Sequence, residues 1–328
     1  MKAMVYEKYG PPNVLALKEV EKPTPKDNEV LIKVRASSVN AYDWHMLRAD
    51  PFFIRAVSGF LKPKNKILGV DVAGQVEAVG KKVTQFRPGD ELYGDLAGSG
   101  GGGFAEYVCA GEKALALKPS GMTFEEAAAV PLAAVTALQG LRDKGKIQSG
   151  QKVLINGASG GVGTFAVQIA KSFGAEVTAV CSTRNLDMAR SIGADHVIDY
   201  TEEDFTKSEQ RYDLILAANG YHSLFDYKRA LSPGGILVLA GGSMAQFYQF
   251  VFLGSWISMA GSKKLVSYVA QPNQKDMVFM AELCEAGKVV PVIDKCYPLG
   301  EVAEAIRYLE EEHARGKVVI TVEHNNET

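Results

Sequence analysis

Residues 152–163 read KVLINGASGGVG, and this stretch decides the fold. A β-branched run, Lys152–Ile155, leads into a cluster of glycines, and the helix-like segment Val162–Phe173 follows. Such a turn lets the backbone approach a pyrophosphate, which the free N–H groups of the helix N-terminus then bind. A bare strand–helix turn is the alternative. The next strand–helix unit, Glu176–Val180 and then Leu186–Ile192, favours a dinucleotide site.

Two further strands, Tyr212–Leu216 and Gly235–Leu239, continue the alternation and predict a parallel, doubly wound sheet. A capping residue followed by acids, at Thr123–Val130, predicts a helix start. The closing segment Gly316–Val322 reads as a strand with no helix after it, so we expect it to return to the sheet of the first domain.

The chain before residue 120 is β-rich, with expected strands at Val30–Val34, Val72–Val79 and Glu91–Tyr93. Residues 51–63, aromatic and with two prolines, are expected to form a long loop with one helical turn. We predict an α/β chain of two domains: a β-rich catalytic domain of residues 1–121 and 262–328, interrupted by a Rossmann dinucleotide-binding domain of residues 122–261.

The charge balance and the cysteines exclude several functions. Lys and Arg total 36 against 38 Asp and Glu, a formal charge of −2, so nothing favours a nucleic-acid partner. The four cysteines are scattered and show neither a disulfide framework nor metal spacing. No signal peptide is expected at the N-terminus. The apolar stretch 247–260 is too short to span a membrane and its role stays open, so we expect a cytoplasmic protein.

The end of the second strand of the nucleotide-binding domain indicates which cofactor is used. An NAD enzyme usually places an acid there for the ribose hydroxyls. This chain instead has Ser182, Thr183 and Arg184, whose hydroxyls and guanidinium suit a 2′-phosphate. A solvated surface arginine is the alternative. The missing acid and the cation together favour NADPH.

The motifs resemble one family. They are SVNAYDW at 38–44, GVDVAG at 69–74, FRPGD at 86–90, LAAVTA at 132–137, GASGGVG at 157–163 and GKVVI at 316–320. Together they are similar to the zinc-free quinone oxidoreductase branch of the medium-chain dehydrogenase/reductase superfamily. Three further strings, AANG at 217–220, SKK at 262–264 and GKV at 287–289, resemble the chloroplast-envelope quinone oxidoreductase homologue group.

The resemblance implies a GroES-like catalytic domain split around the Rossmann domain, NADP(H) as cofactor and a homodimer. Zinc-dependent relatives carry a cysteine where this chain has Asn40, and a His-Glu pair where it has Val70 and Asp71. A catalytic zinc needs three ligands from Cys, His or acid, so we expect no metal. Asp71 is expected to pack or to form hydrogen bonds.

Without a metal, hydrogen-bond donors must stabilise the oxyanion that forms on the acceptor. By resemblance Asn40 lies beside the nicotinamide, and Tyr42 takes the place of the hydroxyl in the proton relay of zinc-dependent relatives. His45 stands where several quinone reductases have tyrosine, so it is a second candidate for the proton donor. Each residue also has a structural alternative: Asn40 as an ordinary strand-end amide, Tyr42 as a hydrogen-bonded core tyrosine and His45 as a packed histidine.

The glycine-rich motif supplies Ser159, Gly160, Gly161, Val162 and Gly163 as cofactor contacts. The resemblance adds Thr136, Tyr200, Asn219, Gly241 and Lys317, and an exposed strand lysine is the alternative for Lys317. Seven aromatic residues could line an apolar substrate cleft or pack in a core: Phe52, Phe53, Phe60, Phe247, Tyr248, Phe250 and Phe252.

The leading functional prediction is transfer of hydride from NADPH to a quinone or to the β-carbon of an α,β-unsaturated carbonyl, with a small hydrophobic carbonyl compound or quinone as substrate. A zinc-free reductase of simple ketones or aldehydes is the alternative enzyme, disfavoured because an unconjugated carbonyl needs stronger polarisation. A low-turnover NADPH-binding sensor or interaction protein is the alternative outside catalysis.

Overall fold

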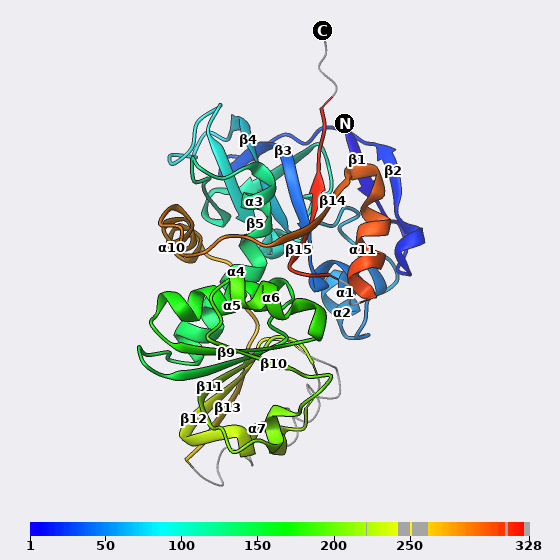
Figure 1. Ribbon diagram of the computed structural model, residues 1–328. Coiled ribbons are helices and arrows are strands. Elements are labelled where there is room, and N and C mark those ends of the chain that lie inside the picture. Colours follow the sequence, from blue (N-terminus) through cyan, green and yellow to red (C-terminus); the bar gives the residue numbers. More distant parts are fainter. Residues whose placement is uncertain (221, 242–249, 251–261, 312–313, 325–328) are drawn as a thin grey trace. The chain divides into compact units, whose positions relative to one another are not determined.

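The structure is a computed structural model that describes residues 1–220, 222–241, 250, 262–311 and 314–324. Contacts divide the chain into two compact units, drawn in Figure 1. Unit 1 comprises residues 1–132, 272–285 and 293–328, and unit 2 comprises residues 133–271 and 286–292. The chain therefore crosses between the units about ten residues beyond each limit predicted from the sequence, and those limits stay a prediction.

Unit 2 is built on one parallel sheet, in which all the neighbouring strands pair in parallel. Its strands are β8 (Lys152–Asn156), β9 (Glu176–Cys181), β10 (His196–Asp199), β11 (Tyr212–Ala217), β12 (Leu231–Leu239) and β13 (Lys264–Ser267). Their spatial order is β10-β9-β8-β11-β12-β13, so the chain winds outward from β8 in both directions. This order is that of a Rossmann fold, which confirms the predicted doubly wound sheet.

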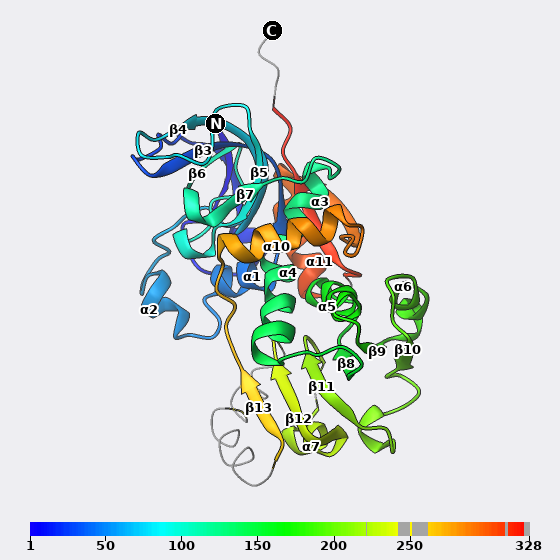
Figure 2. The same ribbon diagram turned by 90° about the vertical axis from the view of Figure 1, so that its left-hand side faces the viewer.

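Helices cover both faces of this sheet. The α-helices of unit 2 that follow its strands are α5 (Gly161–Ser172), α6 (Leu186–Ser191) and α7 (Leu224–Ala230). Helices α5 and α6 lie on one face and α7 on the other (Figure 1, Figure 2). Helix α4 (Pro131–Leu138) and the π-helical turn η4 (Gln139–Lys144) precede β8. Because both faces are covered, the central strands are almost continuously apolar and buried.

Unit 1 is built on a mostly antiparallel sheet of order β14-β15-β3-β4-β5-β7, with β6 paired to β3. Its strands are β3 (Glu29–Val39), β4 (Asp71–Val79), β5 (Glu91–Asp95), β6 (Tyr107–Gly111), β7 (Leu115–Leu117), β14 (Ile293–Pro298) and β15 (Lys317–Thr321). A separate pair is formed by β1 (Lys2–Val5) and β2 (Ala16–Glu19). The closing strand β15 pairs antiparallel with β3, which confirms that the chain returns to its first sheet.

The helices of unit 1 are short. They are α1 (Ala41–Arg48), α2 (Ile54–Ser58), α3 (Phe124–Ala129), α10 (Gln274–Glu285) and α11 (Val302–Glu310). Helix α3 begins at a capping box, in which Thr123 Oγ1 accepts from the Glu126 N–H at 3.1 Å and the Glu126 carboxylate accepts from the Thr123 N–H at 2.8 Å. The predicted helix start is thus confirmed, and α2 is the single helical turn expected in residues 51–63.

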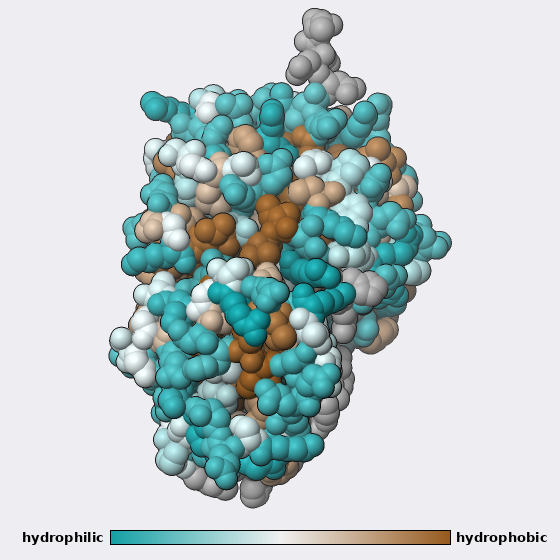
Figure 3. All heavy atoms as spheres, in the orientation of Figure 1, coloured by the Kyte–Doolittle hydropathy of each residue, from teal (hydrophilic) through white to brown (hydrophobic). Residues whose placement is uncertain are grey.

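Short 3-10 turns complete the described chain: η1 (Pro12–Val14), η2 (Ala97–Ser99), η3 (Glu112–Ala114), η5 (Thr183–Asn185), η6 (Phe205–Lys207) and η8 (Leu299–Glu301). On the face drawn in Figure 3 hydrophilic residues predominate, and hydrophobic residues gather in narrow groups. A search of the described residues for helices long and apolar enough to cross a membrane finds none. The stretch 247–260 lies outside the described residues except for Phe250, so its role stays open.

Candidate functional site

At two positions of the glycine-rich loop between β8 and α5, the surrounding chain leaves no room for a side chain. Gly157 has a φ of +79°, and a Cβ there would lie 2.7 Å from the Asn219 backbone nitrogen. A Cβ on Gly163 would lie 2.1 Å from the Gly157 carbonyl oxygen. These two glycines bring the first turn of α5 close to the end of β8, as a dinucleotide-binding loop requires.

Gly160 is different, because neither its backbone nor its neighbours require a glycine. Its φ is −82°, which any residue adopts, and a Cβ would meet only the Gly157 carbonyl oxygen at 3.7 Å. Gly160 is the N-cap of α5, whose first N–H groups, from Gly161 to Gly163, have no partner within the helix. The space beside Gly160 therefore fits a pyrophosphate held by these N–H groups and by the helix dipole.

Ser182, Thr183 and Arg184 follow β9 at the same edge of the sheet. The Ser182 hydroxyl accepts a hydrogen bond from the Asn185 amide at 3.1 Å, and Thr183 and Arg184 are exposed. Sequence reasoning missed Asp199, which ends β10 directly opposite Cys181. Its carboxylate accepts hydrogen bonds from Thr183 and Thr201, which lower its pKa. An acid is thus present near this edge, but on β10 and already hydrogen-bonded.

The other predicted cofactor contacts of unit 2 lie around the carboxyl ends of the strands or on α4. Asn219 follows β11, and its side-chain oxygen accepts from the Gly220 N–H at 2.8 Å. Gly241 follows β12, where a Cβ would lie 2.3 Å from the Ala218 carbonyl oxygen. Tyr200 is exposed after β10, and buried Thr136 on α4 accepts a hydrogen bond from Tyr268 through its carbonyl oxygen. Ser159 and Val162 are half-buried in the glycine-rich loop and the first turn of α5.

In unit 1 the structure brings Asn40, Asp71 and Lys317 together in a buried cluster. Lys317 is 3% exposed and Asp71 is 0% exposed. The Lys317 ammonium donates to Asn40 Oδ1 at 2.5 Å and to Asp71 Oδ2 at 3.2 Å, and Asn40 Nδ2 donates to the same carboxylate oxygen at 2.8 Å. Sequence reasoning left open whether Lys317 is an exposed strand lysine, and its burial removes that alternative.

Asp71 uses both of its carboxylate oxygens within the chain. Oδ2 also accepts from the Ser38 hydroxyl at 2.6 Å, and Oδ1 accepts from the Leu132 N–H at 2.8 Å. Asn40 and Asp71, for which the resemblance implies a cysteine and part of a His-Glu pair in zinc-dependent relatives, thus both bind the Lys317 ammonium in this chain. In the part of the chain that the structure describes, no group of three His, Cys, Asp or Glu residues could hold a metal ion.

Two buried acids beside this cluster were not found by sequence reasoning. Asp43 on α1 accepts from the Asn40 N–H at 2.8 Å and from the Gly69 N–H at 3.0 Å. Asp95 at the end of β5 accepts from the Ala97 N–H at 2.7 Å. Burial raises the pKa of each carboxyl to about 7, with repulsion from Asp71 adding to the effect. Strand register places Asp95 opposite Asp71, and hydrogen bonds to the Asn40 and Gly69 N–H groups hold Asp43 of α1 beside the cluster, so no local motif predicts either acid.

The two predicted proton donors, Tyr42 and His45, both lie on α1. Burial raises the pKa of Tyr42, with Asp43 and Asp95 adding to the rise, so its phenol stays protonated. His45 Nδ1 lies 2.6 Å from the Asp50 carbonyl oxygen, and the ring stacks on Trp44. Burial lowers the pKa of His45. Nδ1 must carry the proton to donate to a carbonyl, so the neutral ring presents Nε2 only as an acceptor. The geometry favours Tyr42 over His45 as the donor.

The seven aromatic residues predicted to line a substrate cleft or pack in a core fall into three groups. Phe52, Phe53 and Phe60 are exposed around α2, and the rings of Phe52 and Phe60 meet edge to face at 6.0 Å. Phe250 packs against the core of unit 2. Phe247, Tyr248 and Phe252 lie outside the described residues. The substrate cleft therefore stays a prediction.

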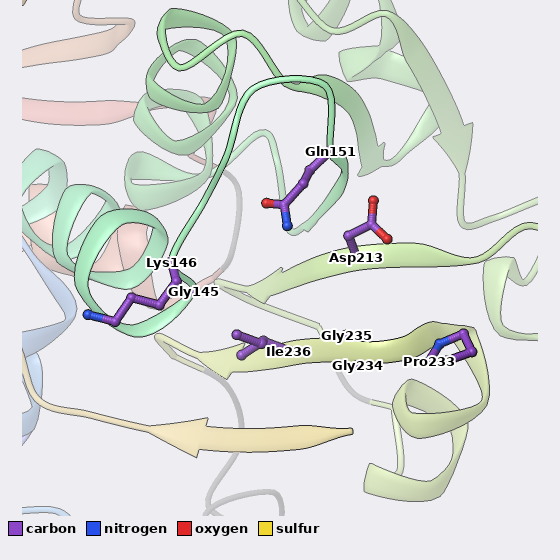
Figure 4. Close-up of a pocket in the computed structure, with 8 residues that line it drawn as sticks. All are labelled: Gly145, Lys146, Gln151, Asp213, Pro233, Gly234, Gly235 and Ile236. Atoms are coloured by element: carbon purple, nitrogen blue, oxygen red, sulfur yellow. The ribbon is translucent and has the colours of Figure 1, made fainter. Parts of the chain in front are cut away.

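Figure 4 shows a pocket of unit 2 at the amino ends of its strands. It is lined by Gly145, Lys146, Gln151, Asp213, Pro233, Gly234, Gly235 and Ile236. The Lys146 side chain points away from Gln151 and Asp213. Ligands of doubly wound sheets bind at the carboxyl ends of the strands, where the glycine-rich loop lies. This pocket is therefore separate from the predicted cofactor site.

Two family models match the chain. The model of the alcohol dehydrogenase GroES-like domain matches residues 26–120, and the model described as zinc-binding dehydrogenase matches residues 192–320. The first match lies within unit 1. The second covers most of the Rossmann sheet and returns into unit 1, as expected if one domain interrupts the other.

Curated relatives match over almost the whole chain. A chloroplast envelope quinone oxidoreductase homolog of Arabidopsis thaliana is 35% identical, over 98% of each chain. A 2-methylene-furan-3-one reductase of Solanum lycopersicum is 37% identical, over 98% of this chain and 79% of the relative. An NADPH-dependent alkenal/one oxidoreductase of Arabidopsis thaliana is 35% identical, over the same shares. Among solved structures, the quinone oxidoreductase from Coxiella burnetii superposes with a TM-score of 0.87 at 29% identity, covering 98% of this chain and 99% of that one.

Proposed function

Because the chain belongs to the zinc-free quinone oxidoreductase branch of the medium-chain dehydrogenase/reductase superfamily, we propose that it is an NADPH-dependent reductase of quinones and α,β-unsaturated carbonyl compounds. The observation that carries the proposal is the buried pair of Lys317 and Asp71, with Asn40 hydrogen-bonded to both. By the resemblance, Asn40 and Asp71 stand where zinc-dependent relatives carry a cysteine and part of a His-Glu pair. With these side chains paired to each other, the chain offers hydrogen-bond donors rather than a Lewis acid. Such donors suit an acceptor that spreads its charge by conjugation.

When bound, NADPH supplies the hydride. The loop around Gly160 and the N–H groups of Gly161 to Gly163 would hold its pyrophosphate, and Ser182, Thr183 and Arg184 would hold its 2′-phosphate. We propose these further contacts with the cofactor: Asn40, Thr136, Ser159, Val162, Tyr200, Asn219, Gly241 and Lys317. The space beside Gly160 and the hydroxyls and guanidinium after β9 support this assignment.

Tyr42 is the proposed proton donor to the oxygen of the acceptor. Its phenol stays protonated, and no described residue forms a hydrogen bond with the hydroxyl in the structure. His45 stays neutral and donates through Nδ1 to a backbone carbonyl, so its role in the proposal is to hold the end of α1. Asp71 and Lys317 position the side chain of Asn40: its Nδ2 donates to Asp71, and its Oδ1 accepts from Lys317.

Replacing Arg184 by alanine should weaken NADPH binding and leave NADH binding unchanged. Loss of one charge-assisted phosphate contact costs roughly 1.5–3 kcal/mol, which is about ten- to a hundredfold in Kd. Titration of each nucleotide into the parent and the variant measures this. Arg190→Ala is the matched control, because Arg190 pairs with Asp187 on the exposed side of α6. Equal affinity of the parent protein for NADH and NADPH would overturn the assignment of residues 182–184.

A panel of acceptors tests the function itself. With NADPH we expect quinones, enones and alkenals to be reduced faster than simple ketones and aldehydes, and alcohols to be oxidised poorly with NADP⁺. Addition of a chelator should leave the rates unchanged. A simple ketone as the best substrate would indicate the carbonyl reductase instead. If no acceptor in the panel causes a loss of NADPH absorbance, the protein would instead be a nucleotide-binding sensor.

Two further properties belong to the proposal. We propose a homodimer, as membership of the family implies, and light scattering of the purified protein at working concentration would show a monomer if this is wrong. We propose a cytoplasmic location. Because several relatives are named as chloroplast proteins, fractionation of the source cells should include plastids where they exist, and recovery there would overturn the cytoplasmic location.

A further inference from the structure

Three buried carboxyl groups and one ammonium lie along one edge of the sheet of unit 1. Ser38 on β3 pairs with Asp71 on β4, and Asp71 pairs with Asp95 on β5. Lys317 begins β15 next to the pair Val318–Val39. Directly opposed residues of antiparallel strands point to the same face, with Cβ atoms about 4.5–5.5 Å apart. The register therefore forces two acids, Asp71 and Asp95, to face each other inside the unit.

The hydrogen bonds distinguish Asp95 from the other two acids. Both oxygens of Asp71 and both oxygens of Asp43 accept hydrogen bonds from N–H or O–H donors, which stabilise the ionised form of a carboxyl group. Asp95 differs: Oδ1 accepts from the Ala97 N–H, whereas Oδ2 is buried and has no hydrogen-bond partner among the described residues. Asp95 itself is 2% exposed.

The charged residues on the neighbouring elements also favour an uncharged Asp95. Asp95 faces Asp71 of β4, Asp43 of α1 and Lys317 of β15. The single ammonium of Lys317 is already paired with Asp71, so a negative charge on the buried Asp95 would stand without compensation. A buried carboxyl group in this position avoids that cost by keeping its proton. The unpartnered Oδ2 is the oxygen that can hold it.

We propose that Asp95 is held as a neutral carboxylic acid and that it returns a proton to Tyr42 in each turnover. This rests on the proposed function, in which Tyr42 is the proton donor. Tyr42 begins α1 beside Asp43, and the charge of Asp95 acts on its phenol. The pKa of Asp95, raised to about 7 by burial and by Asp71, keeps the acid mostly protonated below pH 7 and able to release the proton.

The acceptor gains a hydride with its electron pair at the β-carbon and becomes an enolate. The Tyr42 O–H bond breaks and a new O–H bond forms on the enolate oxygen, leaving a phenolate. The O–H bond of Asp95 then breaks, either directly or through one water, and its proton restores the phenol. Water from the solvent re-protonates Asp95, so one proton is consumed for each hydride.

The charge state is tested first, without turnover. Infrared spectra of the whole protein at pH 6 should contain the carbonyl stretch of protonated carboxyl groups, and Asp95→Asn should weaken this band, with Asp43 accounting for the remainder. Asparagine keeps the acceptor for the Ala97 N–H and replaces the O–H by an N–H, so the fold should survive. Asp27→Asn, at an exposed position, should leave the band intact. A band of unchanged intensity in Asp95→Asn, or no band in the parent protein, overturns the neutral acid.

The relay is tested by the pH dependence of kcat with an enone. The acid form donates, so the parent rate should fall as pH rises through about 7, the pKa of Asp95. Asp95→Asn should lower kcat roughly tenfold or more at pH 6, remove that fall and leave KM unchanged. Asp95→Glu should restore part of the rate. A structural role alone would alter stability or KM but would keep the pH profile, and that outcome overturns the relay.

The two tests separate this inference from the function on which it rests. An infrared band weakened in Asp95→Asn, together with no reduction of any acceptor, overturns the function and the relay but supports the neutral acid. Reduction of enones with a pH profile that Asp95→Asn does not change supports the function and overturns the relay.

Discussion

Lys317→Met is expected to lower the free energy of unfolding of unit 1 by about 3–5 kcal/mol. The substitution keeps the length of the side chain but leaves the buried Asp71 carboxylate without its counter-ion. Repulsion between Asp71 and the neighbouring Asp43 makes that isolated charge more costly still. Urea denaturation followed through Trp44 measures the loss, in a Trp256→Phe background that leaves this tryptophan of α1 as the single reporter.

Two variants control this result. Lys113→Met, at an exposed position of η3, should change the stability by no more than about 0.5 kcal/mol. The double variant Lys317→Met with Asp71→Asn should be less destabilised than Lys317→Met alone, because it removes the uncompensated charge as well. A loss of less than about 1 kcal/mol in Lys317→Met would mean that the pair is as weak as one on the surface.

Tyr42→Phe is expected to lower kcat about a hundredfold or more with an enone as acceptor. The variant removes one hydroxyl and keeps the ring, so the packing of α1 should be preserved. Loss of a donor that stabilises a developing oxyanion raises the barrier by roughly 2.7–4 kcal/mol. Steady-state rates in the parent and the variant measure the effect, with equal thermal midpoints as evidence of an intact fold.

The matched controls for Tyr42→Phe are Tyr297→Phe on β14 and His45→Gln on α1. Tyr297 is half-buried at the other edge of the sheet, and its substitution should leave kcat unchanged. His45→Gln should change kcat far less than Tyr42→Phe does. A fall of less than about threefold in Tyr42→Phe would assign the proton to water or to His45 and leave Tyr42 a structural residue.

The alternating strands and helices of unit 2 could be predicted because each carries a local signal. Glycines mark the turn after β8, and strands buried on both faces read as apolar runs. Strand β3 was predicted at residues 30–34 but extends to Val39, because the buried polar residues Ser37 and Ser38 do not follow an apolar pattern. Their hydroxyls are satisfied by Asp71, which lies more than thirty residues away.

Only those parts of the candidate site that lie in a contiguous sequence motif could be predicted. The glycine-rich loop and residues 182–184 are contiguous and could be found by spacing. The buried charged residues could not be found by spacing. Asp43, Asp71, Asp95 and Lys317 come from four separate segments, and they lie close together only in the folded and buried arrangement. Burial of Lys317 is equally invisible in the sequence, where a lysine that begins a strand looks exposed.

The central claim is that hydride reaches the β-carbon of a conjugated acceptor. The most direct measurement runs the enone assay with NADPH that carries deuterium at the transferred C4 position, and locates the label in the product by NMR. The account predicts a saturated ketone with deuterium on the β-carbon and no allylic alcohol. Deuterium on the carbonyl carbon, in an allylic alcohol, would contradict it and identify a carbonyl reductase.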